Sequence, residues 1–403
     1  MEKEKQLSPQ LRFSEFTDNW KRQKLNNILK PNITKNKEGK YSAKELLSVS
    51  SSAGVVNQIE YKGRSFAGSS VLPYNILLKN QIVYTKSPLK EYPYGIIKFN
   101  NYSNGIVSTL YATYDIKEGN DGDFIDYYFQ HPFRLNKYLK PLVNIGAKND
   151  MKVNNDKVVS DFVIFPHLKE QRKTAQFLMT IDTRIQSLVE MKELLEEYKR
   201  GVMQKIFKQE LRFKNDNGKE FPKWQFKNGN RLFKTISDKN HNSDLPILAI
   251  TQDHGAIPRH LIDYNIDVSK KSVSSYKVVQ VGDFIISLRS FQGGIEYSEY
   301  KGICSPAYII LRPTVELNRN FYKFYLKTSS YIQELTRKLE GIRDGKMISY
   351  KYFSEIKLPF PSLEEQQKIA DFISALDRKI TLVNQQIENT RTYKKGLLQQ
   401  MFV

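Results

Sequence analysis

One short segment of the chain combines side chains that proteins use to read DNA bases. Residues 289–294 read Arg-Ser-Phe-Gln-Gly-Gly and follow an apolar run, 283–288, that predicts a strand. Arg can donate two hydrogen bonds to guanine, Gln can pair with adenine, and paired glycines let backbone approach a groove closely. We therefore expect Arg289, Ser290 and Gln292 to contact DNA. An ordinary hairpin with solvated polar side chains is the alternative.

Comparable segments occur elsewhere in the chain. Residues 85–90 read Thr-Lys-Ser-Pro-Leu-Lys, and two further basic segments, 146–151 and 341–347, precede the two long helical patterns described below. Their basic side chains suit phosphate contacts, with a helix-ending turn as the alternative for the last two segments. The predicted DNA contacts in these segments are Lys86, Ser87, Lys90, Lys148, Asn149, Arg343 and Lys346.

Sequence signatures of catalysis are missing. The sequence contains no Gly-x-x-x-x-Gly-Lys-Ser/Thr loop for ATP and no Asn/Asp-Pro-Pro-aromatic run for gripping a flipped base. Its five histidines form no catalytic or metal-binding spacing, and a single cysteine, Cys304, permits no intramolecular disulfide. We predict no catalytic residue and no metal site. A self-sufficient nuclease or methyltransferase stays the alternative because carboxylates are abundant.

The charge balance favours a polyanionic partner. The 403 residues carry 63 Lys and Arg against 43 Asp and Glu, a net charge of +20. Nucleic acid is the favoured partner and an acidic membrane surface the weaker alternative. A coiled-coil scaffold without a DNA role is a third possibility. No run approaches the roughly 18 apolar residues of a membrane span, and no apolar signal segment follows the N-terminus. We expect a cytoplasmic protein with no membrane partner.

The chain contains an internal duplication. Residues 166–207 align without a gap on residues 361–402 at an offset of 195, with 15 of 42 positions identical. A weaker echo matches Leu11-Arg12-Phe13 and Trp20 with Leu211-Arg212-Phe213 and Trp224. The two repeated segments hold eight basic and six acidic residues, and six and five, so +17 of the net charge belongs to the rest of the chain. The blocks outside the repeated segments are therefore the expected DNA-binding parts.

Both repeated segments predict long helices. Each opens with Pro, and apolar residues then recur at steps of three and four, which is the spacing of a helix-pairing seam. The predicted seam comprises Leu178, Ile181, Ile185, Leu188, Leu195, Ile373, Leu376, Ile380, Val383 and Ile387. Lys199 and Lys394 interrupt it at the same step. Two equivalent units related by a pseudo-twofold axis require antiparallel helices, and about 38 helical residues span roughly 57 Å.

These patterns predict an α/β (α+β) fold class, with two mixed α/β blocks joined by two long antiparallel coiled-coil helices. The predicted boundaries are 1–165, 166–207, 208–360 and 361–403. In the second block, Leu245–Thr251, Asp283–Leu288 and Ala307–Arg312 predict strands and Phe321–Leu339 predicts one helix. The segments 75–85, 105–115 and 124–139 occupy comparable places in the first block.

The chain resembles the specificity (S) subunits of Type I restriction-modification systems. The resemblance rests on Pro-x-Leu-x-Glu-Gln at 166–171 and 361–366, each opening a long helix, and on Val-Gly-Asp-Phe-Ile-Ile-Ser at 281–287. Asn80 and Gln81 depart from the Gly-Asp form of this second motif in the first block.

The resemblance implies two target recognition domains, each reading half of a bipartite site on double-stranded DNA that has different sequences in its two halves. It implies helices that set the spacer, and docking of two methyltransferase (M) subunits and two restriction/translocase (R) subunits. It also implies a non-catalytic chain that binds no cofactor itself, with S-adenosylmethionine, ATP and Mg²⁺ bound by the partner subunits.

Overall fold

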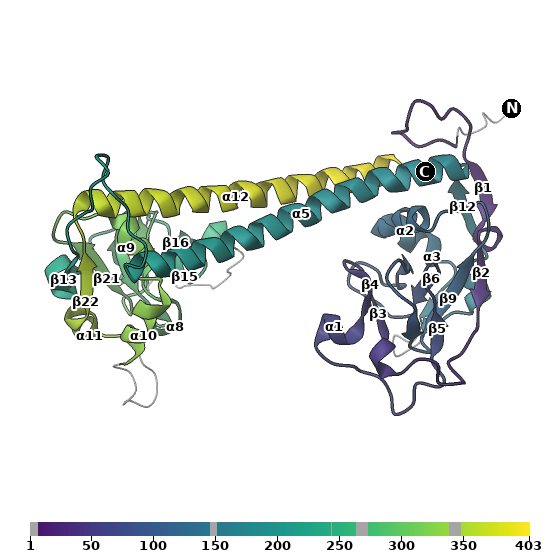
Figure 1. Cartoon of the computed structure of the whole chain (residues 1–403), viewed down its shortest axis with the longest axis horizontal. Helices are drawn as coiled ribbons and strands as arrows, with labels where there is room; N and C mark the ends of the chain where they lie inside the picture. The colour runs from purple at the N-terminus through teal and green to yellow at the C-terminus, as the bar shows by residue number, and fades with distance from the viewer. Residues whose placement is uncertain (1–6, 146–150, 243, 263–272, 338–347) are drawn as a thin grey trace. The chain divides into compact units, whose positions relative to one another are not determined.

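The computed structural model describes residues 7–145, 151–242, 244–262, 273–337 and 348–403 (Figure 1). The chain divides into two compact units. Unit 1 comprises residues 1–189 and 385–403, and unit 2 comprises residues 190–384. Each unit is described by itself below.

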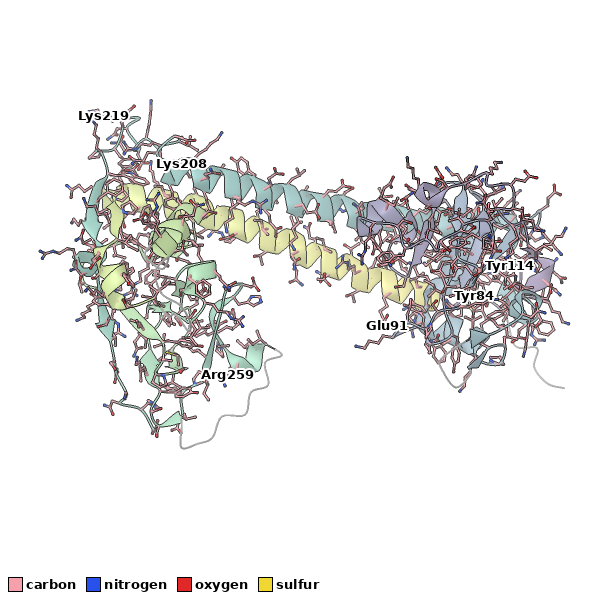
Figure 2. All side chains as sticks on the ribbon, turned by 90° about the horizontal axis from the view of Figure 1, so that it is seen from below. Tyr84, Glu91, Tyr114, Lys208, Lys219 and Arg259 are labelled. Atoms are coloured by element: carbon pink, nitrogen blue, oxygen red, sulfur yellow. The ribbon has the colours of Figure 1, made fainter. Side chains whose placement is uncertain are left out.

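Unit 1 is built around a four-stranded antiparallel sheet. Its strand order is β2 (Leu29–Asn32), β9 (Tyr111–Ile116), β6 (Ile82–Thr85) and β7 (Ile97–Phe99). Tyr84 and Tyr114 are almost fully buried in its core, and Figure 2 labels both among the packed side chains. Their hydroxyls donate to the carbonyls of Tyr94 at 2.7 Å and Asn155 at 3.1 Å, so burial leaves no polar tip unpaired.

Smaller elements surround this sheet. The two-stranded sheets pair β1 (Lys21–Lys24) with β12 (Phe162–Phe165), β3 (Leu47–Ser50) with β4 (Gly54–Asn57), β5 (Asn75–Leu77) with β8 (Gly105–Val107), and β10 (Asn144–Ile145) with β11 (Met151–Lys152). The helices are α1 (Gln58–Lys62), α2 (Gly122–Gln130), α3 (Pro132–Leu139) and α4 (Asn155–Val158). The short helices η1 (Leu25–Asn27) and η2 (Ala43–Glu45) complete the unit.

Unit 2 repeats this plan. Its four-stranded antiparallel sheet has the order β14 (Phe233–Ile236), β21 (Ile309–Pro313), β18 (Phe284–Ile286) and β19 (Glu296–Tyr297). The two-stranded sheets pair β13 (Gln225–Asn228) with β22 (Lys357–Phe360), β15 (Leu248–Thr251) with β16 (Gly255–Pro258), and β17 (Lys277–Val279) with β20 (Gly302–Cys304). The short helices are α6 (Gly229–Leu232), η3 (Arg259–Leu261), α8 (Ser290–Gly293), α9 (Arg319–Tyr325), α10 (Ser329–Arg337) and α11 (Tyr350–Glu355).

The single helix predicted over 321–339 is wrong. Helix α9 ends at Tyr325 and α10 begins at Ser329. Thr328 lies between them, and its hydroxyl accepts a hydrogen bond from the backbone N–H of Tyr331 at 3.3 Å. A threonine that caps a new first turn competes with continuation of the preceding helix.

The departure of Asn80 and Gln81 from the Gly-Asp motif preserves the local backbone. Asn80 has φ 68° where Gly282 has φ 89°, and asparagine is one of the few residues that accept this region. The N–H of Asn80 donates to Asn100 and that of Gly282 donates to Ser298, each at 2.8 Å. The two blocks therefore share this turn despite different sequences.

The next position pairs across the sheet in both units. Gln81 Nε2 donates to Asp115 Oδ1 at 2.5 Å in unit 1. In unit 2, Asp283 accepts from Arg312 at 2.7 and 2.8 Å. An amide-to-carboxylate hydrogen bond in one block thus takes the place of an ion pair in the other.

Two long helices, α5 (Leu168–Phe207) and α12 (Leu363–Gln400), match the predicted repeat. Their first turns are held alike. Gln171 Nε2 donates to the carbonyl of Pro166, and Gln366 Nε2 to that of Pro361, each at 2.9 Å. The other amide atom, Oε1, accepts from the N–H of Asp121 or Asn318, also at 2.9 Å. The conserved Gln of the repeat therefore ties each helix to the adjacent block.

Burial along the two helices follows the predicted seam. Leu178, Ile181, Leu188, Ile373, Val383 and Ile387 are buried, and Ile185, Leu195, Leu376 and Ile380 are half-buried. Leu194 and Leu382 lie off the seam and are 66% and 64% exposed. The apolar stripe is thus the covered face of each helix.

The lysines that interrupt the seam pair with a repeated aspartate. In unit 1, Lys394 contacts Asp182 at 2.6 Å, and in unit 2, Lys199 contacts Asp377. Since α5 begins in unit 1 and ends in unit 2 while α12 does the reverse, the two helices run in opposite chain directions. The predicted fold class is confirmed. The predicted domain boundaries, 1–165, 166–207, 208–360 and 361–403, stay a prediction. The two compact units meet inside α5 and α12 and so do not test boundaries at the helix ends.

Candidate nucleic-acid interface

In unit 1, the predicted segment 85–90 leaves β6 and places its three polar residues differently. Lys86 is half-buried, and its Nζ donates to Asn155 Oδ1 at 3.0 Å. Burial, with a smaller effect of Lys35, lowers the pKa of Lys86. Ser87 is half-buried and Lys90 is exposed. Lys90 is therefore the side chain of this segment that is most open to a phosphate.

In unit 2, the predicted loop 289–294 contains one helical turn, α8. Arg289 and Gln292 are exposed, three residues apart. Ser290 is only 1% exposed, and its Oγ accepts from the N–H of Ser287 at 2.9 Å. Ser290 therefore holds the turn in place, and Arg289 and Gln292 are the side chains open to a ligand.

The paired glycines have a packing role. A Cβ on Gly294 would lie 2.1 Å from the carbonyl oxygen of Leu326, and one on Gly293 would lie 2.7 Å from the side chain of Gln252. The close approach of the Leu326 carbonyl explains Gly294, whereas the exposed side chain of Gln252 could move away from a side chain at position 293. Gly294 is therefore no longer evidence for approach to a DNA groove. The remaining predicted contacts, Lys148, Asn149, Arg343 and Lys346, lie outside the described residues.

An exposed aromatic and basic segment of unit 1 is absent from the contacts predicted from the sequence. Tyr61 and Phe66 are 51% and 53% exposed after β4, and Lys62 and Arg64 are exposed beside them. The run Tyr-Lys-Gly-Arg-Ser-Phe at 61–66 is the signal that could have found it, since alternating cations and aromatics suit nucleic acid.

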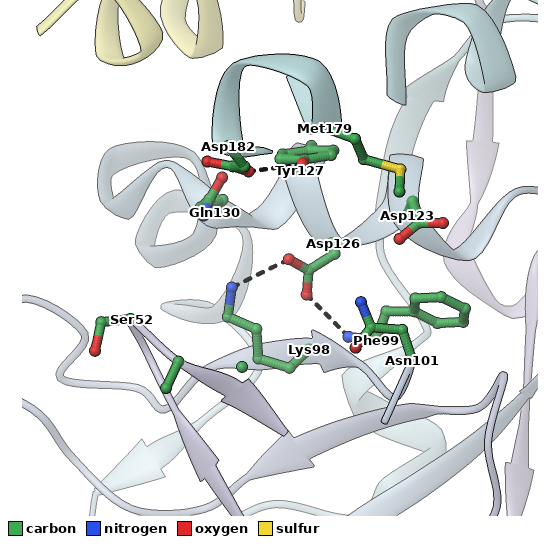
Figure 3. A pocket seen from close by; sticks show the side chains of 12 residues that line it. Ser52, Lys98, Phe99, Asn101, Asp123, Asp126, Tyr127, Gln130, Met179 and Asp182 are labelled. Carbon is green, nitrogen blue, oxygen red and sulfur yellow. Dashed lines mark hydrogen bonds and ion pairs between the residues drawn. The ribbon is translucent and has the colours of Figure 1, made fainter. Parts of the chain in front are cut away.

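Unit 1 also contains a polar pocket of about 310 Å³ beneath α2 and α5 (Figure 3). Lys98 is buried there and its Nζ contacts Asp126 Oδ2 at 3.1 Å, while Asp126 Oδ1 accepts from the N–H of Phe99 at 2.9 Å. On the other side, Asp182 accepts from the hydroxyl of Tyr127 at 2.7 Å. Two carboxylates of the pocket are thus engaged in holding α2.

The third carboxylate of this pocket has an altered pKa. Burial, together with the nearby charges of Asp121 and Asp126, raises the pKa of Asp123 to about 6. A raised pKa in a pocket is a feature of functional sites, but ion-pair networks produce it as well. Here the neighbouring groups already explain it.

The equivalent pocket of unit 2, about 480 Å³, has the opposite arrangement of charges. Glu296 lies on β19 where Lys98 lies on β7, and both Oε atoms contact Lys327 Nζ at 2.6 Å. Burial raises the pKa of Glu296 to about 7, although Lys327 opposes the shift. Because the cation and the anion have exchanged sides, the two blocks share a scaffold and not a common charged site.

The part of the chain that the structure describes gives little support for a metal site, a cysteine nucleophile or a membrane span. No group of three or more His, Cys, Asp or Glu side chains there could hold a metal ion. Cys304 is buried, and burial raises its pKa to about 12, so the thiol is not activated as a nucleophile. None of the described helices is long and apolar enough to cross a membrane.

Comparisons with known proteins agree with the predicted resemblance. Residues 220–390 match the family model of the Type I restriction modification DNA specificity domain. Two curated relatives from Methanocaldococcus jannaschii are named type I restriction enzyme specificity subunits. MjaX is 27% identical over 62% of this chain, and MjaVIII is 24% identical over 58%. The matches span 61% and 59% of the relatives' own lengths.

The fold is also known from a solved structure. The crystal structure of a Type I restriction-modification S subunit from M. genitalium aligns over 98% of this chain and 99% of its own, with a TM-score of 0.54 and 15% identity. At this identity the likeness concerns the fold. The predicted resemblance to S subunits is confirmed.

Proposed function

We propose that the whole chain is the DNA sequence-specificity subunit of a Type I restriction-modification complex, because residues 220–390 match the family model of the DNA specificity domain of these systems. The observation that carries the proposal is the repetition of one architecture, sheet order included, in two blocks whose exposed segments differ. Two blocks with the same scaffold and different surfaces suit a protein in which each block binds a different DNA sequence. The chain then contributes recognition, and its partners contribute the chemistry.

In this proposal each block reads one half of an asymmetric bipartite site. Most of the excess positive charge, +17 of +20, lies outside the repeated helices, where contacts with the phosphate backbone would form. The two helices set the spacer. A helix of 40 residues is about 60 Å long, and half-site centres on one side of a duplex recur about every 34 Å.

The proposal also includes docking of two M subunits, which supply S-adenosylmethionine, and of two R subunits, which use ATP and Mg²⁺. Most identities of the repeated segments have a partner within the chain, as Asp182, Lys199 and their equivalents do. Tyr198 and Tyr393 are large side chains that are identical between the repeats and are 54% and 57% exposed. An exposed tyrosine at the same position of both copies suits one kind of partner that binds twice.

The first experiment measures DNA binding. The purified chain with its M subunits is titrated with a duplex that carries the bipartite site found by sequencing methylated bases in the host genome. Affinity should fall steeply between 50 and 200 mM salt, by about 10³-fold or more for six phosphate contacts. Scrambling either half-site is the control. Salt-independent binding, or DNA cleavage or methylation by the isolated chain, would refute the proposal.

A second experiment tests the docking surface. Tyr198→Ala and Tyr393→Ala should each reduce the M subunits bound per chain from two to one, and the double variant should bind none. Native mass spectrometry measures the ratio, and Tyr61→Ala is the control because Tyr61 is similarly exposed and lies on the short helix α1, outside α5 and α12. Two bound M subunits in the double variant would exclude these tyrosines from the interface.

A further inference from the structure

The exposed segment after β4 presents a stack of cations on an aromatic ring. Helix α1 ends at Lys62, and Gly63 turns the chain with φ 74°. Beyond this turn, Arg64 Cζ lies 4.6 Å and Lys62 Nζ lies 5.6 Å from the centroid of the Phe66 ring. Both cations can therefore interact with the ring while their polar ends stay accessible.

Hydrogen bonds fix this segment on the block. The N–H of Phe66 donates to Gln58 Oε1 at 2.5 Å, and Gln58 Nε2 donates to the hydroxyl of Ser48, on β3, at 2.9 Å. Asn57 caps α1 and also donates to the carbonyl of Lys44 at 2.8 Å. The ring is thus held at a defined place, which lowers the entropy lost when a ligand binds.

The charge on the segment remains available to a ligand. Glu60, the nearest acidic residue in sequence, accepts from the hydroxyl of Tyr102 at 2.6 Å. Among the ion pairs of the described residues, none involves Lys62 or Arg64. Two exposed cations beside an exposed ring suit a polyanion with flat bases, which is the chemistry of DNA.

The corresponding connection of unit 2 differs. Gly54 and Gly255 have φ 69° and 65° at the tips of the equivalent hairpins, so the preceding scaffold is shared. After the second hairpin the chain forms η3, Arg259–Leu261, whose sequence differs and contains no phenylalanine or tyrosine. Variation on a shared scaffold is expected where the two blocks read different half-sites.

Building on the proposed function, we propose that Arg64 and Phe66 form a base-reading element of unit 1. Phe66 provides the apolar surface against a base, Arg64 donates its paired N–H groups to a guanine in the major groove, and Lys62 contacts a phosphate. The ring keeps the guanidinium plane oriented, so the reading requires arginine and not merely a positive charge.

The test uses the chain assembled with its M subunits. Methylated sites are sequenced genome-wide for the wild type and for Arg64→Lys, Phe66→Ala and Lys62→Ala. Arg64→Lys and Phe66→Ala should relax one guanine-containing half of the site and weaken binding to the cognate duplex about tenfold or more, while the other half stays unchanged. Lys62→Ala should weaken binding to all sequences alike and reduce the salt slope by about one.

The control is Phe133→Ala, which removes a ring that is 72% exposed elsewhere in unit 1 and should leave the site unchanged. If the wild-type complex methylates no bipartite site, the proposed function itself fails. If it does, and Arg64→Lys and Phe66→Ala both keep the wild-type site and affinity, only this inference is overturned. A half-site without guanine would exclude the role given to Arg64.

Discussion

Replacing Arg212 with Ala should destabilise unit 2 more than replacing its equivalent, Arg12, destabilises unit 1. In unit 2, Arg212 contacts Glu365 through Nε at 3.1 Å and Nη2 at 2.9 Å, and the Glu365 side chain is fully buried. Among the described residues the indole N–H of Trp224, which matches Trp20 in the repeat, is buried without a hydrogen-bond partner, so Glu365 accepts no bond from it. Loss of Arg212 therefore leaves a buried carboxylate with little to replace it.

Unit 1 has a second donor at the same place. Glu170 accepts from Arg12 at 2.7 and 2.8 Å, and also from the indole N–H of Trp20 at 3.0 Å. A hydrogen bond to a charged group contributes about 1.5–3 kcal/mol. Trp20 should therefore keep Glu170 partly paired after Arg12 is removed.

These contacts set the expected magnitudes. Removing one partner of a buried ion pair costs about 3–5 kcal/mol. Because Arg212 is 24% exposed, water can replace part of it and we expect the lower end, about 3 kcal/mol. Arg12→Ala should then cost about 1 kcal/mol after the contribution of Trp20 is retained. For units of this size, these values correspond to about 6–12 °C and 2–4 °C in Tm.

Differential scanning calorimetry of the single variants measures the two losses, and hydrogen exchange at the starts of α5 and α12 assigns them to their units. Trp20→Phe should raise the cost of Arg12→Ala toward that of Arg212→Ala, since it removes the second donor. Arg212→Met combined with Glu365→Leu should recover most of the stability. Equal losses for the two arginine variants, or no effect of Trp20→Phe, would refute the explanation.

Three further outcomes are expected. Asp123→Asn should stabilise the protein at pH 8 by at most about 1 kcal/mol after discounting for solvent screening, and should have no such effect at pH 4. The pKa of Asp123 is raised to about 6, so folding favours the protonated carboxyl, and that stabilising contribution is lost as pH rises through this value. Thermal unfolding at both pH values checks this. Phe402→Ala should cost about 3–5 kcal/mol, because the ring is 4% exposed and packs on Phe124 at 5.3 Å; chemical denaturation measures it. Inserting four helical residues after both Val189 and Asn384 adds about 6 Å and should lengthen the preferred DNA spacer by one to two base pairs, as methylated-site sequencing would show.

Features that depend on periodicity could be predicted from the sequence. The three-and-four spacing marked the covered face of both helices, because a helix buries its apolar stripe whatever packs on it. The partners of Lys199 and Lys394 were not predictable. Each lies more than 170 residues from its aspartate in sequence, and only folding brings them together.

Local features failed where tertiary contacts decide them. The paired glycines Gly293 and Gly294 suggested close approach to a DNA groove, but Gly294 is explained by the carbonyl of Leu326. Ser290 looked like a polar reader and is buried. The contact of Lys62 and Arg64 with the Phe66 ring was not predicted, because aromatic residues lie more often in the core than at the surface and only the folded structure shows that this ring is exposed.

The backbone contact at the end of each long helix does not depend on chain connectivity. The N–H of Leu211 donates to the carbonyl of Lys205 at 3.2 Å just after α5, and the N–H of Leu11 donates to Gln400 at 2.9 Å, at the corresponding turn of α12. After α5 the partner of this contact follows directly along the chain, and after α12 it comes from a segment almost 400 residues away in sequence. The same contact therefore forms whether or not its two sides are neighbours in the polypeptide.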